Sequence, residues 1–133
     1  MNMGWHVAAV AAGGAVGASL RFGANELFVR QGWYGLPLAT LAVNVAGCLL
    51  AGMVLVWLEY RGPATPLWRS LLMTGFLGGL TTFSALGVEL WQLLRAERYL
   101  YAIATSLAHL LLGVLAVAAG FRLARAWWPG TGG

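Results

Sequence analysis

Four long apolar segments dominate this chain of 133 residues and limit the folds that are open to it. They cover roughly residues 5–28, 35–58, 70–94 and 99–121. Each is long enough to cross a bilayer, since a spanning helix needs about 20 predominantly apolar residues. The composition agrees, because 60% of the residues are hydrophobic and 9% are charged. We therefore predict an all-α integral membrane protein with one four-helix transmembrane domain over residues 1–133.

The third segment contains a stretch that suits a continuous helix poorly, GFLGGLTTFSALGVE at residues 75–89. Its glycines each weaken a helix by about 1 kcal/mol relative to alanine, and its hydroxyl side chains can bond to nearby backbone groups. Backbone groups freed at membrane depth are tolerated only where protein or a wet cavity satisfies them, and such breaks often form ion sites. The stretch predicts a break near the middle of the third helix, although close helix packing alone would also explain it.

Two pairs of glycines have the GxxxG spacing that is typical of closely packed membrane helices. Gly13 and Gly17 lie in the first segment, and Gly75 and Gly79 lie in the third. We expect these positions to let neighbouring backbones approach each other, with little direct part in function.

The arginine balance between the two sides of the membrane should set the orientation of the chain. One side would hold both termini and the second loop, with four arginines: Arg61, Arg69, Arg122 and Arg125. The other side would hold three arginines, Arg30, Arg95 and Arg98, and a fourth if Arg21 reaches that side. This near-zero bias predicts insertion in both orientations. Two opposite copies could then pair about a two-fold axis in the membrane plane.

Polar residues recur at helical spacing inside the second and fourth segments. Thr40 and Asn44 share one helix face, and Tyr101, Thr105 and His109 form a similar stripe. An asparagine at membrane depth is costly unless its amide finds partners. These residues either join neighbouring helices or line a polar path. His109 by itself fits a hydrogen-bonded core histidine or a titrating group.

Further candidates flank the interruption of the third segment. Phe83 and Leu86 share a face just after it, where Phe83 could be ordinary core or could turn its partly positive edge to an anion. Glu89 follows one or two turns later, and Arg21 lies near the end of the first segment. Charged residues inside a membrane are functional candidates, whereas at an interface their presence costs little.

Charge and motif content exclude several other functions. The chain has eight arginines, four glutamates and no lysine or aspartate, for a net charge of +4. No basic face is formed, so we expect the arginines to meet the headgroups of a lipid bilayer and expect no nucleic acid as partner. The sequence has no HExxH, CxxC, GxSxG or P-loop motif, so we do not expect an enzyme.

Three stretches resemble the Fluc (CrcB-type) family of fluoride channels. They are GGAVGASLRFG at residues 13–23, TLAVNVAGCLLAG at residues 40–52 and GFLGGLTTFSALGVE at residues 75–89. The resemblance covers nearly the whole chain, and its most specific part is TTFS after a double glycine. It implies a passive channel that exports fluoride across the cell inner (plasma) membrane. It also implies an antiparallel dual-topology homodimer with two pores.

The resemblance implies roles for individual residues as well. A central structural sodium ion would be bound by the backbone carbonyls of Gly78 and Thr81. The fluoride pore, with Thr40 and Leu86 included, would comprise eight residues: Thr40, Asn44, Phe83, Ser84, Leu86, Tyr101, Thr105 and His109. The vestibule would hold Arg21 and Glu89.

The chain departs from the family's usual TTFSTF motif in two places. Ala85 replaces a threonine and Leu86 replaces the second phenylalanine, which predicts a changed rate or occupancy. Two other function classes stay open: a small proton-coupled multidrug exporter with four spans, and a non-transporting assembly subunit of the membrane. Such an exporter uses an acid in its first span, where this chain has only Glu26, near an interface.

Overall fold

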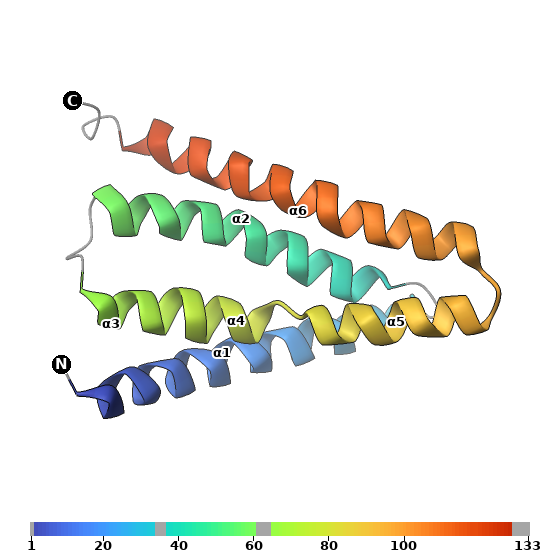
Figure 1. Ribbon diagram of the computed structural model, residues 1–133, viewed down its shortest axis with the longest axis horizontal. Coiled ribbons are helices and arrows are strands. Elements are labelled where there is room, and N and C mark those ends of the chain that lie inside the picture. The colour runs from blue at the N-terminus through green and yellow to red at the C-terminus, as the bar shows by residue number, and fades with distance from the viewer. Residues whose placement is uncertain (1, 34–36, 61–64, 129–133) are drawn as a thin grey trace.

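The computed structural model describes residues 2–33, 37–60 and 65–128, and within these ranges all regular structure is helical (Figure 1). The elements in chain order are α1 Met3–Arg30, α2 Leu38–Tyr60, α3 Pro66–Arg69, η1 Ser70–Leu77, α4 Gly78–Leu80, α5 Phe83–Arg95 and α6 Tyr99–Trp127. The element η1 is a stretch of π-helix that continues α3 into α4. The predicted start of the second span at residue 35 and the predicted side of Arg61 lie outside the described residues.

Four stretches are long and apolar enough to cross a membrane: α1, α2, the run Pro66–Arg95 and α6. They confirm the predicted all-helical, four-span chain. The third run begins at Pro66 rather than at residue 70, because proline fits the first helical turn, where its missing N–H is not needed. The last helix continues to Trp127. The guanidinium carbon of Arg125 lies 4.6 Å from the centre of the Tyr60 ring and joins the last turn of α6 to α2.

The four spans alternate in direction, and both termini lie at the same end of the molecule (Figure 1). α1 packs against η1 and α4, and α2 packs against α6. Few large side chains are fully enclosed; Val56 is the largest of them among the described residues. Many large apolar side chains on α1, α5 and α6 are exposed instead. Such surfaces suit contact with lipid or with another protein chain.

Glycines bring the paired helices into backbone contact. A Cβ atom added at Gly17 of α1 would lie 2.8 Å from the backbone nitrogen of Leu80. A Cβ atom added at Gly52 of α2 would lie 2.7 Å from the backbone nitrogen of Phe121. Contacts this short leave no room for a side chain, so the helices can approach this closely only through glycine. The contacts agree with the packing role predicted for the GxxxG pair of α1.

Two extended residues, Thr81 and Thr82, separate α4 from α5. Their φ and ψ angles are −88° and 154° for Thr81 and −149° and 122° for Thr82. The Thr81 N–H still donates to the Leu77 carbonyl at 2.9 Å. The Thr82 hydroxyl then accepts from the N–H of Ala85 at 3.1 Å and caps the start of α5. The path of the third span is therefore interrupted at one point and restarted by a local hydrogen bond.

Candidate functional site

The backbone of Thr82 is held by the side-chain amide of Asn44 on α2. The Thr82 N–H donates to Asn44 Oδ1 at 2.8 Å, and Asn44 Nδ2 donates to the Thr82 carbonyl at 3.0 Å. This pair of hydrogen bonds identifies the oxygen and the nitrogen of the Asn44 amide, because the Thr82 backbone supplies one donor and one acceptor. Asn44 thus satisfies both polar groups of an extended residue inside an apolar segment. One amide N–H of Asn44 is left over for another acceptor.

The interruption also removes the helical donors of two carbonyls. In a continuous helix the Thr82 N–H would bond to the carbonyl of Gly78, because each amide donates to the residue four positions earlier. By the same rule the Ala85 N–H would bond to the carbonyl of Thr81. These amides donate instead to Asn44 Oδ1 and to the Thr82 hydroxyl. The carbonyls of Gly78 and Thr81 are therefore suited to accept from water or to bind a cation.

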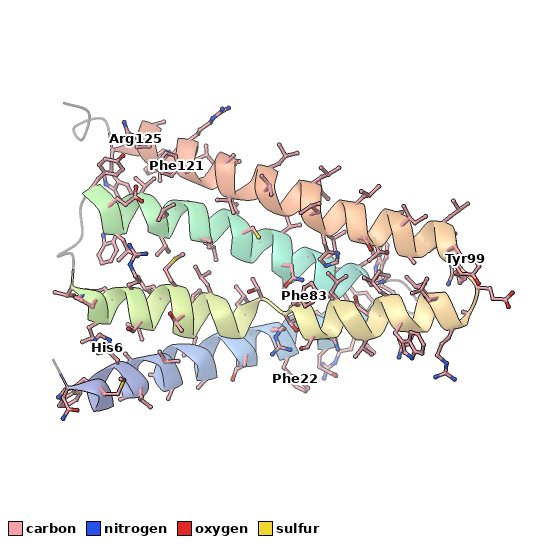
Figure 2. The ribbon with its side chains drawn as sticks, in the orientation of Figure 1. His6, Phe22, Phe83, Tyr99, Phe121 and Arg125 are labelled. Atoms are coloured by element: carbon pink, nitrogen blue, oxygen red, sulfur yellow. The ribbon has the colours of Figure 1, made fainter. Side chains whose placement is uncertain are left out.

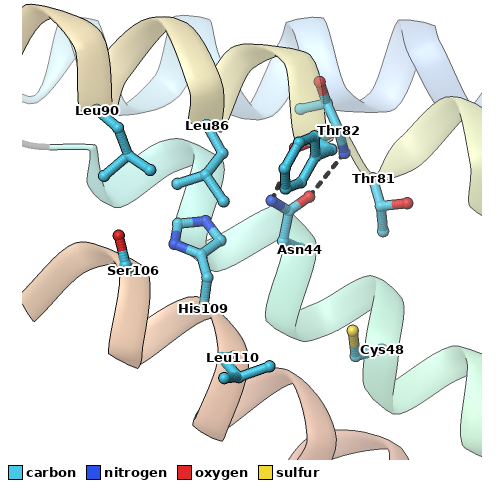
Figure 3. Close-up of a pocket in the computed structure, with 10 residues that line it drawn as sticks. Asn44, Cys48, Thr81, Thr82, Leu86, Leu90, Ser106, His109 and Leu110 are labelled. Atoms are coloured by element: carbon cyan, nitrogen blue, oxygen red, sulfur yellow. Dashed lines mark hydrogen bonds between the residues drawn. The ribbon is translucent and has the colours of Figure 1, made fainter. Parts of the chain in front are cut away.

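A groove of about 470 Å³ lies beside Thr82 and is bounded by α2, α5 and α6 (Figure 3). Its polar lining consists of Asn44, Thr81, Thr82, Ser106 and His109. Its apolar lining consists of Cys48, Phe83, Leu86, Leu90 and Leu110. The groove therefore has hydrogen-bonding groups from three spans and a mainly hydrocarbon wall. This combination can replace part of the water around a small ion.

A second space of about 230 Å³ shares Thr82 with the groove and is more polar. Its polar lining consists of Thr82, Arg21, Thr40, Glu89 and Asn25, and its apolar lining consists of Phe22, Ala39, Val43 and Ala85. Arg21 Nε donates to the Gly79 carbonyl at 3.0 Å, and the Thr40 hydroxyl donates to Glu89 Oε1. The other carboxylate oxygen, Glu89 Oε2, is buried without a hydrogen-bond partner among the described residues. A cation and a carboxyl group therefore border one space beside Thr82.

Comparison with known proteins fits this arrangement. A sequence model of the family described as "CrcB-like protein, Camphor Resistance (CrcB)" matches residues 8–121. A protein of Xylella fastidiosa (strain M23) named "Fluoride-specific ion channel FluC" is 44% identical over 111 residues, which is 84% of each chain. Proteins with the same name are 41% identical in Xanthomonas euvesicatoria, over 83% of each chain, and 38% identical in Hahella chejuensis, over 90% of this chain and 94% of that one. The chain belongs to the CrcB family.

Five of the eight residues predicted for the pore of this CrcB-family chain border one of the two spaces. Asn44, Phe83, Leu86 and His109 line the groove, and Thr40 lines the second space. Phe83 and Leu86 share the groove but differ in burial, since Leu86 is 7% exposed and Phe83 is 84% exposed. Phe83, which lies near the middle of the molecule's length (Figure 2), is therefore not a core residue of the single chain. Its ring is available to lipid, to an ion or to a second chain.

The other three residues predicted for the pore line neither space. The Ser84 side chain is exposed, and its hydroxyl lies 3.2 Å from the Thr82 hydroxyl. Tyr101 is half exposed, and the guanidinium carbon of Arg98 lies 4.1 Å from the centre of its ring. Thr105 contributes its carbonyl, which lies 3.0 Å from His109 Nδ1. The predicted stripe on α6 therefore reaches the groove only at His109.

Two residues of the site were missed by the sequence analysis. Thr82 borders both spaces. The sequence suggested a role only for its hydroxyl, because it does not show that the side-chain amide of Asn44 binds the Thr82 backbone. Ser106 lines the groove with His109, and its hydroxyl donates to the Ala102 carbonyl at 2.9 Å. The three-residue spacing of Ser106 and His109 was the available signal, since such residues share a helix face.

Proposed function

We propose that this CrcB-family protein is a passive, fluoride-selective ion channel of the cell inner membrane that exports fluoride. The observation that carries the proposal is the match to relatives named as fluoride-specific ion channels, over 84% of both chains in one case. The geometry around Thr82 supports the same function. Two spaces with different polar linings meet at one extended residue in the middle of a membrane span. The protein acts as a channel and not as an enzyme.

The chemistry of fluoride suits the groups that surround the two spaces. Fluoride is small, strongly hydrated and a good hydrogen-bond acceptor, so a selective path must replace its water with donors. Arg21 would attract the anion to the second space, and the unused N–H of Asn44 would meet it at Thr82. The edge of the Phe83 ring would provide a further partly positive contact in the groove. Ala85 and Leu86 offer only hydrocarbon to these spaces, which predicts weaker binding than hydroxyl and aromatic groups would give.

The working unit in this proposal is an antiparallel homodimer with two pores, inserted in both orientations. Among the described residues three arginines lie at each end of the molecule: Arg69, Arg122 and Arg125 at the end with both termini, and Arg30, Arg95 and Arg98 at the other. This balance gives neither orientation an advantage. A second chain would also cover exposed apolar surface, including Phe83 at 84% exposure.

Cysteine labelling tests the two-way insertion in a variant that lacks Cys48. Single cysteines placed near each terminus should each react with a membrane-impermeant reagent from both sides of the membrane, in comparable amounts. Reaction from one side only would contradict the antiparallel dimer.

A structural sodium ion on the dimer axis completes the proposal. The carbonyls of Gly78 and Thr81 have lost their helical donors to Asn44 and Thr82. The same two carbonyls from two chains would surround one point with about four oxygens. Calcium and magnesium favour carboxylate oxygens, and the described residues contain no cluster of three or more acidic, histidine or cysteine side chains. A monovalent cation fits this oxygen set better. Replacing sodium by a large organic cation should lower the fluoride flux.

Fluoride efflux from liposomes tests the function most simply. Liposomes loaded with fluoride and containing the purified protein should release it rapidly once an ionophore dissipates the opposing potential. Matched liposomes loaded with chloride should release little, and liposomes without protein give the background. Retention of fluoride by the protein-containing liposomes would contradict the channel proposal. A multidrug exporter or a non-transporting subunit would give that result.

A further inference from the structure

The two ring nitrogens of His109 lie in different surroundings. Nδ1 is 3.0 Å from the carbonyl oxygen of Thr105, one helical turn earlier. A carbonyl only accepts hydrogen bonds, so Nδ1 must carry a hydrogen. In the neutral ring the lone pair is then on Nε2. Nε2 is buried and has no hydrogen-bond partner among the residues that the structure describes.

A hydrogen-bond partner for this buried lone pair would have to come from outside the described residues. A buried polar atom left without a hydrogen bond costs about 1–3 kcal/mol, and most such atoms in folded proteins are paired. His109 lines the groove with Asn44 and Ser106, and its ring points toward Leu86 (Figure 3). The ring therefore faces the space in which an ion would travel.

Among the described residues, no charged side chain lines the groove and could bind Nε2 of His109. On α2 the other titratable group that lines the groove is the thiol of Cys48, and α5 contributes the apolar Phe83, Leu86 and Leu90. The carboxyl group of Glu89, also on α5, borders the second space and accepts from Thr40. On α6 itself the charged residues are Arg122 and Arg125 near its end, and Arg98 lies just before its start, against Tyr101. A partner for Nε2 would thus have to enter the groove from outside the chain.

The neutral ring is a poor ligand for fluoride, because the Nε2 lone pair repels an anion. The protonated ring donates from Nε2 and attracts it. We infer that His109 binds fluoride together with a proton, as an imidazolium–fluoride pair in the groove beside Thr82. The inference rests on the proposed fluoride-channel function and specifies how one residue of its path binds the ion.

The step balances without any other reactant. A proton from water adds to Nε2, and the new N–H donates to the fluoride ion. The same pair forms when hydrogen fluoride transfers its proton to the Nε2 lone pair. No covalent bond to carbon changes and no electron is transferred. Fluoride occupancy at His109 should therefore increase as the pH falls, because the pair takes up one proton for each fluoride ion that it binds.

Planar-bilayer recording is the appropriate test, because current excludes the electroneutral leak of hydrogen fluoride through lipid. At constant fluoride concentration, the wild-type current should rise several-fold between about pH 7.5 and about pH 5.5. H109Q keeps a neutral amide donor at every pH, so its current should be nearly independent of pH. H6Q is the matched control, because His6 is the only other histidine and lies at the end that holds both termini (Figure 2). It should keep the wild-type pH response.

A pH response of H109Q equal to that of the wild type would overturn the inference and leave the channel proposal intact. A measurable wild-type current without pH dependence would do the same. Absence of wild-type current at both pH values would overturn the channel proposal and this inference together.

A second measurement does not depend on the conductance of a variant. In H6Q the only histidine is His109, so nitrogen-15 labelling of histidine gives one pair of ring signals. Addition of fluoride at constant pH should move the Nε2 signal toward that of a protonated ring, and chloride at the same concentration should not. Equal spectra in fluoride and chloride would overturn the inference.

Discussion

The two halves of the third span pack in opposite ways. The first half, from Pro66 to Leu80, contacts α1 backbone to backbone, with Gly75 and Gly79 facing Val10 and Gly14. The second half, α5, borders the groove and the second space. A Cβ atom added at Gly87 of α5 would meet no atom within 4 Å. One continuous apolar segment thus holds a tightly packed part and an open part, separated by Thr81 and Thr82.

This difference shows how a small membrane protein can be rigid and still leave room for an ion. The glycine contacts determine where α4 ends, because α4 packs so closely against the backbone of α1 that it cannot slide along it. The end of α4 sets the position of Thr82, and Asn44 then holds the extended backbone. Glycine therefore has different consequences in the two halves. In the first half Gly75 and Gly79 are needed for contact with α1, whereas in the second half Gly87 meets no neighbour.

Substitution of Gly17 should have the largest effect. Gly17→Ala places a Cβ atom 2.8 Å from the Leu80 nitrogen and closer still to the Phe76 carbonyl. Neither backbone atom can move alone, so α1 and α4 must separate, at a cost of about 3 kcal/mol. Gly87→Ala is the matched control and should be neutral or stabilising by up to about 1 kcal/mol. Unfolding in a detergent titration measures both. Equal effects of the two substitutions would contradict the comparison.

The double glycine at the end of the first half offers a sharper pair. Gly79→Ala brings a Cβ atom to 2.6 Å from the Gly14 carbonyl and should cost about 2 kcal/mol. Gly78→Ala meets only the Met73 carbonyl at 3.8 Å, an ordinary contact, so the chain should fold as well as the wild type. The same unfolding titration distinguishes them. If Gly78→Ala were the more destabilising of the two, packing against α1 would not be what determines the position of the end of α4.

Ser84→Ala should give the smallest effect. The Ser84 hydroxyl lies outside both spaces and contacts the site only through the Thr82 hydroxyl, at 3.2 Å. Loss of one neutral, exposed hydrogen bond is worth about 0.5 kcal/mol, so fluoride flux should fall only about twofold. Liposome efflux measures it. A loss of flux as large as that from substitutions at Asn44 would mean that Ser84 contacts the ion directly.

The sequence predicted the architecture well, because membrane spans depend on properties that a sequence displays directly. Apolar length identified the four spans, and the GxxxG spacing of Gly13 and Gly17 identified a packing face. Boundaries were less certain. The third run begins earlier than predicted, at Pro66, and the last helix continues to Trp127, beyond the contact of Arg125 with Tyr60.

The site was predicted only in part, because its geometry depends on contacts between spans. Helical spacing placed Tyr101, Thr105 and His109 on one stripe, but the stripe turns away from the groove before it reaches Tyr101. Thr40 and Asn44 lie one turn apart on α2, yet their side chains border different spaces. The partners of Asn44 could not be known until the end of α4 was located.

Fluoride flux through Asn44→Ala tests the central claim most directly, namely that Thr82 and Asn44 form the junction between the two spaces. The substitution removes both bonds to Thr82 and leaves its N–H and carbonyl without partners, at about 1–3 kcal/mol each. We predict a flux at least about tenfold lower than wild type in protein that still folds and inserts into the membrane. Cys48→Ala, one turn further along α2 in the same groove, should change the flux little. Folded Asn44→Ala protein that conducts fluoride at the wild-type rate would contradict the account.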